Sequence, residues 1–314
     1  MSIRIGVAPG AWEWTAGGES FFRFVEAAEA LGWDSIWLTD RVISKQVSLE
    51  PVTALAAVAA RTSKIKFGTA VIALPFRNPV VLAKELATVD FLSGGRLLPA
   101  VGLGTDDPRE MEAFGVPKKE RAGRTDEAVG LLRRLWREDG VTHHGKYFHL
   151  TNVTVRPKPL FKPFLPIWIG GRTEYALKRV ARVGDGWLAS SVTPQEVAQS
   201  VRAIKEGLVS YGRSIENDHY GVMLPVYLAG SKDEALSHLP VGVGRSRPNV
   251  PVEAFGAFGT AEEVHARIKE YVEAGASKFV LRLACTEHES PEQLRGLARY
   301  VVVPINAGTM DYAG

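Results

Sequence analysis

Short apolar runs alternate with amphipathic segments along almost the whole chain, and this alternation limits the possible folds more than any other feature. The apolar runs, expected as strands, cover residues 3–7, 35–38, 65–71, 97–101, 167–169, 187–190, 222–228 and 279–283. The segments expected as helices cover residues 20–31, 50–60, 79–91, 121–136, 174–183, 193–211, 261–274 and 291–301. Eight such pairs predict an α/β fold with a parallel sheet, closed as a single (β/α)8 TIM barrel domain over residues 1–314.

Helix start signals agree with this division. Thr193-Pro194 and Ser290-Pro291 each place a capping hydroxyl before a proline, which is favoured at the first position of a helix. Thr260 and Glu263 have the spacing of a capping box. We therefore expect helices to begin at these three points.

Two segments exceed what a minimal barrel needs. Residues 140–165 predict a small hairpin inserted after the fourth helix. Residues 231–257 are rich in Gly and Pro and follow the seventh strand. Loops at that position lie on the face of a barrel that carries the active site, so we expect a lid or substrate loop there.

Composition excludes several classes of partner. The 314 residues carry a net charge of +3, and Lys and Arg are dispersed, so no nucleic-acid partner is expected. No apolar run approaches the roughly 20 residues of a membrane span. The single cysteine, Cys285, forms no intramolecular disulfide and fits a reducing compartment. Residues 1–7 lack the features of a signal peptide, so we expect a cytoplasmic protein.

Candidate site residues cluster where the predicted strands end, which is the active-site face of a barrel. They are Asp40 and Arg41 after the second strand, Gly68, Ala70 and Val71 in the third, Gly102, Gly104 and Thr105 after the fourth, and Gly170, Gly171 and Arg172 after the fifth. Without a Cβ, a glycine lets a flat ring or a phosphate approach the backbone.

The clearest of these is Gly170-Gly171-Arg172, which runs directly into a predicted helix. Backbone N–H groups at a helix N-terminus bind phosphate, and Arg172 adds a positive charge. The alternative is a tight turn in which a glycine has positive φ.

Other residues leave more than one interpretation open. Asp40 and Arg41 could form a surface ion pair, a substrate clamp or a catalytic pair. Asp106 and Asp107 could act in the pocket or cap a helix.

Aromatic and histidine residues are equally open. Trp12 and Trp14 could line an aromatic ligand or anchor a loop by packing. His143 and His144 lack further ligands at usable spacing, so no metal site is expected.

Several segments together resemble the luciferase-like monooxygenase superfamily, which comprises flavin- and deazaflavin-dependent oxidoreductases. These segments are residues 30–40, 66–71, 77–79, 92–96, 166–171, 184–187 and 259–282. Residues 39–42 with residues 97–100 are most similar to a branch assigned to the deazaflavin coenzyme F420.

The resemblance implies that an isoalloxazine-like ring lies across the strand ends. It implies a non-proline cis peptide between Ala70 and Val71, a cofactor contact by Asp40, and a ring lined by Gly104 and Thr105. It also implies that Gly170 and Gly171 hold the cofactor phosphate, and we add Gly68, Gly102 and Arg172 to the expected cofactor site.

Two departures bear on the substrate. Sugar-phosphate dehydrogenases of the family carry His where this chain has Arg41, and Glu where it has Thr105. The acid–base pair proposed for sugar oxidation is therefore absent, and Arg41 could instead bind an anionic group of a substrate.

We accordingly expect an F420-dependent oxidoreductase that transfers a hydride between the deazaflavin and a small organic substrate, with Asp40 and Arg41 as the catalytic residues. The alternatives are an FMN-dependent monooxygenase that uses O2, and a flavin-binding protein without turnover. A homodimer is expected through the apolar surface of the second and third helices at Leu55, Val58, Val80 and Leu86, unless these residues pack on the barrel.

Overall fold

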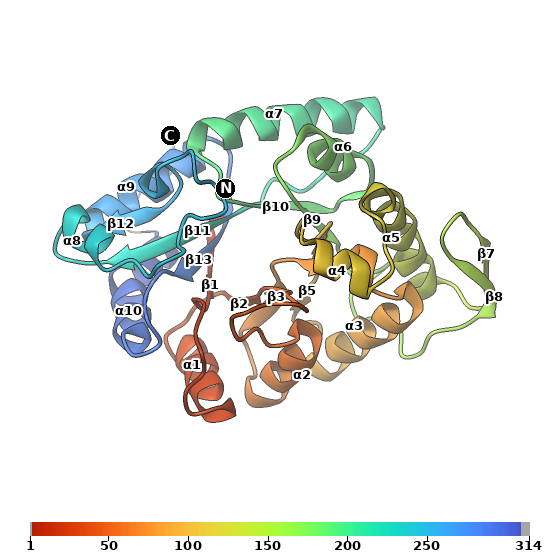
Figure 1. Cartoon of the computed structure of the whole chain (residues 1–314), viewed down its shortest axis with the longest axis horizontal. Coiled ribbons are helices and arrows are strands. Elements are labelled where there is room, and N and C mark those ends of the chain that lie inside the picture. Colours follow the sequence, from red (N-terminus) through yellow and green to blue (C-terminus); the bar gives the residue numbers. More distant parts are fainter. Residues whose placement is uncertain (1, 309–314) are drawn as a thin grey trace.

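A computed structural model of the chain describes residues 2–308, and within them eleven strands form one curled sheet (Figure 1). Every strand pair in this sheet is parallel. The path runs β4-β6-β9-β10-β11-β13-β1-β2-β3-β5, with β12 beside β11. The strands are β1 (Arg4–Ala8), β2 (Ser35–Leu38), β3 (Lys66–Thr69), β4 (Ile72–Ala73), β5 (Leu97–Leu98), β6 (Ala100–Gly102), β9 (Trp168–Gly170), β10 (Gly186–Ser190), β11 (Tyr220–Leu228), β12 (Ala257–Gly259) and β13 (Lys278–Leu283).

Two of the predicted strands are each split into two short pieces. The run predicted over residues 65–71 ends as a strand with β3 at Thr69, and β4 follows beyond the predicted end, with the predicted cis Ala70–Val71 peptide between the two. The run predicted over residues 97–101 is divided at Pro99, which has no N–H to donate to a neighbouring strand. The Thr69 hydroxyl donates to the carbonyl of Ala100 (2.7 Å) and accepts from its N–H (2.9 Å), which joins the two split strands.

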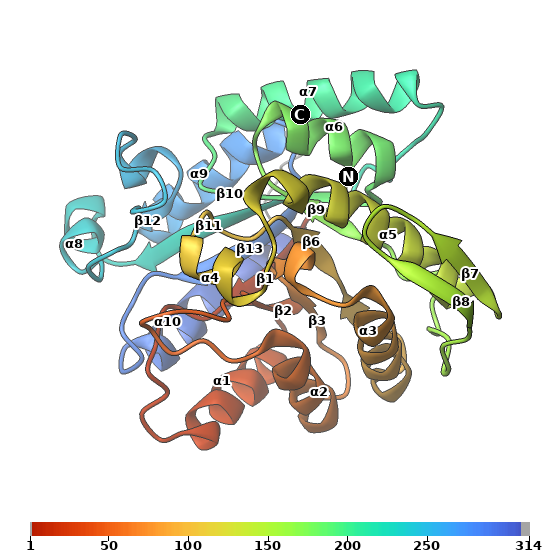
Figure 2. The same cartoon turned by 45° about the vertical axis from the view of Figure 1, so that its right-hand side comes forward.

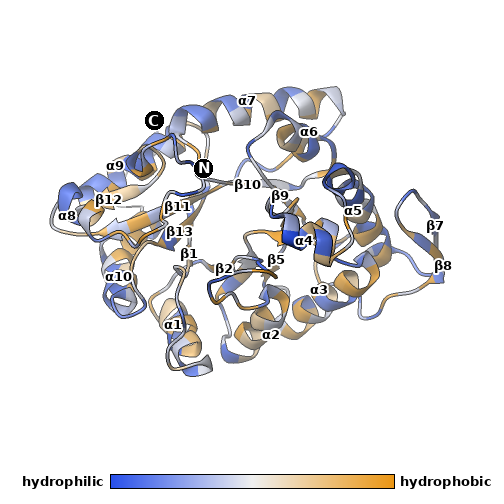
Figure 3. Ribbon diagram, in the orientation of Figure 1, coloured by the Kyte–Doolittle hydropathy of each residue, from blue (hydrophilic) through white to orange (hydrophobic). Residues whose placement is uncertain are grey.

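Most helices surround the sheet on its outer side, and the short α4 lies in front of the strands in both views (Figures 1 and 2). They are α1 (Gly18–Ala30), α2 (Pro51–Arg61), α3 (Pro79–Ser93), α4 (Pro108–Ala113), α5 (Arg121–Arg137), α6 (Glu174–Val183), α7 (Pro194–Ser210), α8 (Lys232–Ser237), α9 (Ala261–Glu273), α10 (Ser290–Leu297) and α11 (Val303–Asn306). Neighbouring outer helices pack on one another, as α1 does on α2 and α6 on α7. They carry both hydrophobic and hydrophilic residues, as expected for helices with one face on a sheet and one in water (Figure 3).

The cap predictions are confirmed at two of three positions. Thr193 and Thr260 both form complete capping boxes, at the starts of α7 and α9. The prediction for Ser290 is wrong: this residue already lies inside α10, and its hydroxyl donates to the carbonyl of Glu287 (2.7 Å) instead.

The structure contains elements that the sequence pattern does not predict. Helices α4 and α8 have six residues each, which is too short for a clear apolar period. The last predicted helix continues beyond α10 through a π-helical turn (Ala298–Val302) into α11.

The segment of residues 140–165 contains two antiparallel strands, β7 (Val141–His144) and β8 (His149–Val153), which extend past α5 in Figure 2. The carboxylate of Glu127 on α5 anchors this hairpin. It contacts the His143 ring at 3.0 Å and accepts the backbone N–H of Phe148 at 2.9 Å.

Two tryptophans fill the space that the sheet encloses. Trp37 and Trp168 are almost fully buried, with ring centroids 6.4 Å apart. Glycines on adjoining strands make room for them: a Cβ on Gly68 would lie 2.8 Å from the Trp37 ring, and a Cβ on Gly186 would lie 2.5 Å from the Trp168 ring. The buried members of this inner cluster are Ala8, Trp37, Ala100, Trp168, Leu188 and Val280.

A buried ion pair lies beside this cluster, at the amino-terminal end of the strands. The Lys278 ammonium donates to the Asp34 carboxylate and to the Ser35 hydroxyl (2.7 Å), which also accepts the Trp37 indole N–H (2.8 Å). Burial raises the pKa of Asp34, but the Lys278 charge and hydrogen bond outweigh burial, so the net shift is downward. Burial also lowers the pKa of Lys278. The tryptophan at the centre is thus held by a polar network beneath it.

The surface proposed for dimerisation is not available at the predicted residues. Leu55, Val58 and Leu86 are buried in the core between helices and sheet, and Val80 packs against the same core. The alternative interpretation, packing on the barrel, is therefore correct for them.

No helix within residues 2–308 has the length and apolar character needed to cross a membrane.

We predict that Gly186→Ala destabilises the protein by about 1–3 kcal/mol, because the new methyl group overpacks against Trp168. Urea unfolding followed by tryptophan fluorescence measures this. Gly130→Ala is the matched control, since this helical glycine has open space at its Cβ position and alanine favours helix. Equal stability of Gly186→Ala and the wild type would contradict the packing account.

A second prediction concerns acid stability. The pKa of Asp34 in the folded protein is lower than its value of about 3.9 in the unfolded chain. The ionised Asp34 carboxylate therefore stabilises the fold fully above pH ~3.9, and this stabilisation is lost as the pH falls through the pKa of the folded state. Asp34→Asn should therefore be less stable at pH 7 and lose less further stability on acidification to pH ~2. Urea midpoints at both pH values, with exposed Asp233→Asn as control, test this. A parallel decline in Asp34→Asn and wild type would refute it.

Candidate functional site

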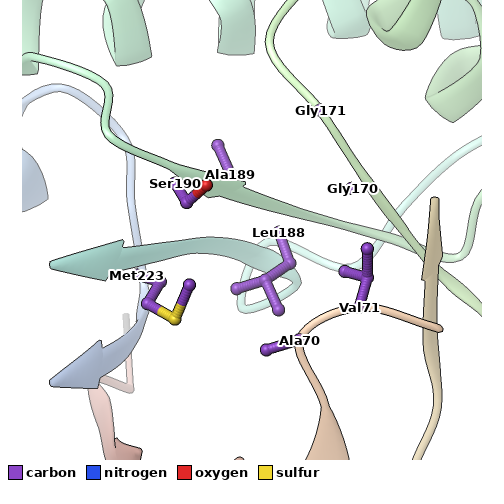
Figure 4. A pocket seen from close by; sticks show the side chains of 8 residues that line it. All are labelled: Ala70, Val71, Gly170, Gly171, Leu188, Ala189, Ser190 and Met223. Carbon is purple, nitrogen blue, oxygen red and sulfur yellow. The ribbon is translucent and has the colours of Figure 1, made fainter. Parts of the chain in front are cut away.

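A pocket opens at the carboxyl edge of the sheet (Figure 4). The peptide segment between β3 and β4 forms one side, and the ends of β9 and β10 with the middle of β11 form the rest. The lining residues are Ala70, Val71, Gly170, Gly171, Leu188, Ala189, Ser190 and Met223. The pocket therefore brings together Ala70, Val71, Gly170 and Gly171 from the predicted cofactor site.

The wall around Val71 depends on two glycines. A Cβ added to Gly102 would lie 2.7 Å from a Val71 methyl carbon, and one added to Gly170 would lie 2.8 Å from the other. Larger residues at either position would displace Val71. Gly102 thus borders the pocket from behind Val71, although it is not among the lining residues.

The turn after β9 combines a glycine at positive φ with the N-terminus of a helix. Gly171 has φ +124°, which is the strained region that favours glycine, so the tight-turn interpretation holds. Its carbonyl accepts the indole N–H of Trp187 (2.8 Å), and Thr173 caps α6 by accepting the Ala176 N–H (3.3 Å). A helix of ten residues therefore begins right beside the pocket, with its N-terminal N–H groups directed toward that end.

Arg172 is exposed and reaches across the pocket edge. Its guanidinium donates weakly to the carbonyls of Ser190 (3.5 Å) and Ser246 (3.4 Å). No carboxylate within residues 2–308 pairs with it. It is therefore a cation beside the pocket that remains able to bind an anion.

Asp40 does not pair with Arg41. Its carboxylate, with 1% of its side chain exposed, accepts from Arg77 at 3.0 Å and from the backbone N–H of Ala73 at 3.0 Å. Arg77 also pairs with Glu50 (3.1 Å). Burial lowers the pKa of Arg77, but the two carboxylates outweigh burial and raise it. Asp40 and Arg77 thereby fix the chain just beyond the cis peptide of the pocket wall.

Gly68, Gly104 and Thr105 are not among the residues that line the pocket. Gly68 faces the Trp37 ring, and Gly104, with φ +74°, packs against Ala73. The Thr105 hydroxyl donates to the carboxylate of Glu110 on α4 (2.9 Å).

Sequence reasoning missed two of these partners. Glu110 is 3% exposed and lies in a helix that the sequence did not predict. Arg77 is present in the segment 77–79 that carries the family resemblance, and that was the available signal for it.

Asp106 and Asp107 have structural roles, which is one of the two interpretations that the sequence left open. Asp107 caps α4 by accepting the Arg109 N–H (3.0 Å), and hydrogen bonds from Arg109 lower the pKa of Asp107 to about 2. Asp106 pairs with Lys118 (2.9 Å). Both carboxylates are therefore already satisfied.

The tryptophans of the first loop also have a structural role. Trp12 donates its indole N–H to the carbonyl of Cys285 (2.8 Å) and meets Trp14 and Phe24 edge to face. Among residues 2–308 there is no group of His, Cys, Asp and Glu side chains that could hold a metal ion.

The segment of residues 231–257 lies against the strand ends beside the pocket. Its Ser246 hydroxyl hydrogen-bonds to that of Ser191 (2.8 Å), just beyond β10. Arg247 donates to the Ser191 carbonyl (3.1 Å) and to the Glu196 carboxylate (2.6 Å). These contacts hold the segment at the pocket edge.

Known proteins share this sequence pattern and fold. The F420-dependent glucose-6-phosphate dehydrogenase of Kineococcus radiotolerans is 29% identical over 292 residues, which are 82% of this chain and 85% of that protein. An F420-dependent secondary alcohol dehydrogenase, solved with an F420-acetone adduct, has a TM-score of 0.84 at 21% identity and covers 96% of this chain and 99% of its own. The monooxygenase RslO1 from Streptomyces bottropensis has a TM-score of 0.82 at 23% identity, with 96% and 99% covered.

The sequence profile of one family, the luciferase-like monooxygenases, matches residues 3–250. This match spans the strands, the cis peptide and the glycine turn that build the pocket. The chain belongs to the luciferase-like monooxygenase family.

Proposed function

We propose that this protein is an F420-dependent oxidoreductase that transfers a hydride between the deazaflavin and a small organic substrate. The observation that carries the proposal is the pocket formed by the cis Ala70–Val71 segment and the Gly170-Gly171 turn, at the carboxyl edge of the sheet. The names of the related F420-dependent dehydrogenases support the choice of coenzyme. We further propose that the curled sheet is a closed (β/α)8 barrel, with the hairpin and the segment 231–257 as insertions. We also propose that the protein acts as a cytoplasmic homodimer, through a surface other than Leu55, Val58, Val80 and Leu86, which are packed in the core.

The residues present fit a flat, phosphorylated coenzyme. A Cβ at Gly170 or Gly102 would collide with Val71, so glycine at both positions keeps that wall flat. Gly171, the N-terminus of α6 and Arg172 would hold a phosphate group. When bound, the deazaflavin would supply the hydride chemistry, and the protein would orient the coenzyme and shield it from water.

The other pocket residues would exclude water. Leu188, Val71 and Met223 place apolar side chains around the same space (Figure 4). An apolar surrounding protects a reactive hydride donor from side reactions with solvent.

Asp40 and Arg77 would act by positioning. Because both Asp40 oxygens accept hydrogen bonds within the protein, this carboxylate holds the pocket wall through Ala73. We propose that Arg41 contacts the substrate. Since Arg41 and Thr105 replace the His and Glu of sugar-phosphate dehydrogenases, we propose that glucose 6-phosphate is not the substrate.

An FMN-dependent monooxygenase is the second candidate, which the similarity to the monooxygenase RslO1 favours. Both coenzymes present a flat ring and a phosphate to the same pocket. A non-catalytic flavin-binding protein is the third candidate, and turnover with any substrate would exclude it.

The proposed function predicts that the protein binds F420 more tightly than FMN, measured by the fluorescence change of each coenzyme on titration. Gly170→Ala should weaken F420 binding by about tenfold, because the methyl group displaces Val71 from the pocket wall. Gly130→Ala, far from any such contact, should bind as the wild type does. Tight binding of FMN without binding of F420 would replace the proposal by the monooxygenase.

The positioning role of Arg77 predicts a loss of stability. Arg77→Ala leaves the Asp40 carboxylate buried without its cation, at a cost of about 3–5 kcal/mol, and Arg77→Lys should restore part of it. Thermal unfolding and F420 affinity should fall together in Arg77→Ala. As the control, Arg202→Gln changes an exposed arginine that has no ion pair. Unchanged F420 affinity in a destabilised Arg77→Ala would rule out the positioning role.

A further inference from the structure

Arg282 lies near the carboxyl end of β13 and on the inner face of the sheet. It follows Val280 by two residues, so both side chains point to the same side of the strand. Val280 belongs to the inner cluster with Trp37 and Trp168, and its neighbour in register is the pocket residue Met223. Arg282 therefore lies on the same inner face as Val280, two residues nearer the carboxyl end of β13 and the open edge of the sheet.

This guanidinium has no partner within the described residues 2–308. Its side chain is only partly exposed, yet no hydrogen bond or ion pair of the protein satisfies it. Arginines in such places are normally paired with a carboxylate or with backbone carbonyls, as Arg96 is in this protein with the carbonyls of Ile65 and Ala59. Burial lowers the pKa of Arg282, and no acidic group opposes this shift.

A second unpaired arginine lies nearby. Arg41 follows β2, and in the sheet only β1 separates β2 from β13, so Arg41 and Arg282 lie at the same edge on nearby strands. The charge of Arg41 also lowers the pKa of Arg282. The charge of Arg41 lowers the pKa of Asp107, but the Asp107 carboxylate accepts its hydrogen bonds from the backbone and side chain of Arg109. Within residues 2–308, neither Arg41 nor Arg282 forms an ion pair with a carboxylate.

We propose that Arg41 and Arg282 form a binding site for an anionic group, such as a carboxylate, of the organic substrate. The proposal deepens the proposed function, because it names the class of substrate that the same pocket would take. Two guanidinium groups recognise a carboxylate or phosphate through charge-assisted, often bidentate, hydrogen bonds. An anion also relieves the repulsion between the two arginines.

The position separates this site from the one assigned to the coenzyme phosphate. In the sheet, β9 with its glycine turn and β13 with Arg282 are separated by β10 and β11. Three strand spacings place the two sites about 14 Å apart. One phosphate group cannot contact both, so the Arg41–Arg282 site is left for the substrate.

Isothermal titration with malonate, at constant ionic strength, tests the proposal on the protein with and without saturating F420. Malonate should bind in both states, and its neutral analogue malonamide should not. Arg282→Met and Arg41→Gln should each weaken malonate binding by about tenfold or more. Arg202→Gln, which removes an exposed arginine elsewhere, should leave it unchanged. If Arg282→Met does not fold, exposed Arg41→Gln gives the answer.

Two results would overturn the proposal. Malonate affinity equal to the wild type in Arg282→Met or Arg41→Gln would show that these arginines do not form the site. Loss of malonate binding on saturation with F420 would assign the arginines to the coenzyme's own acidic groups. Failure of F420 to bind at all would refute the proposed function, while the titration without coenzyme would still test the anion site.

Discussion

The packing of two tryptophans inside the sheet is the constraint on which the site depends. Trp37 and Trp168 occupy the enclosed space, and glycines on adjoining strands leave the room they need. Because this space is filled, a ligand can enter only above the rings, at the carboxyl edge. The buried Lys278–Asp34 pair and the Ser35 hydroxyl hold Trp37 from beneath, so a polar network fixes the pocket floor.

The pocket wall depends on a second polar arrangement. Asp40 is expected from the family resemblance to contact the coenzyme, and in the structure its carboxylate accepts hydrogen bonds from Arg77 and from the N–H of Ala73. Under the proposed function, this carboxylate would also affect coenzyme binding indirectly, because it holds the chain next to the Ala70–Val71 peptide.

Most of the fold could be predicted from local sequence pattern. The alternation of apolar and amphipathic segments placed all eight strand positions and the main helices, and capping residues located the starts of α7 and α9. The breaks in two strands could not be predicted this way, since they depend on Pro99 and on a peptide isomer at residues 70–71. The six-residue helix α4 is too short to show a period.

The candidate site was predictable to the extent that it consists of glycines at strand ends. Partners that meet only in three dimensions were not: Arg77 with Asp40, and Glu110 with Thr105. A crystal structure of the protein with F420 tests the central claim most directly. The deazaflavin ring should lie against the Ala70–Val71 peptide, above Trp37 and Trp168, with the coenzyme phosphate at the Gly170–Gly171 turn. A ring bound elsewhere, or tryptophans displaced to admit it, would contradict the account.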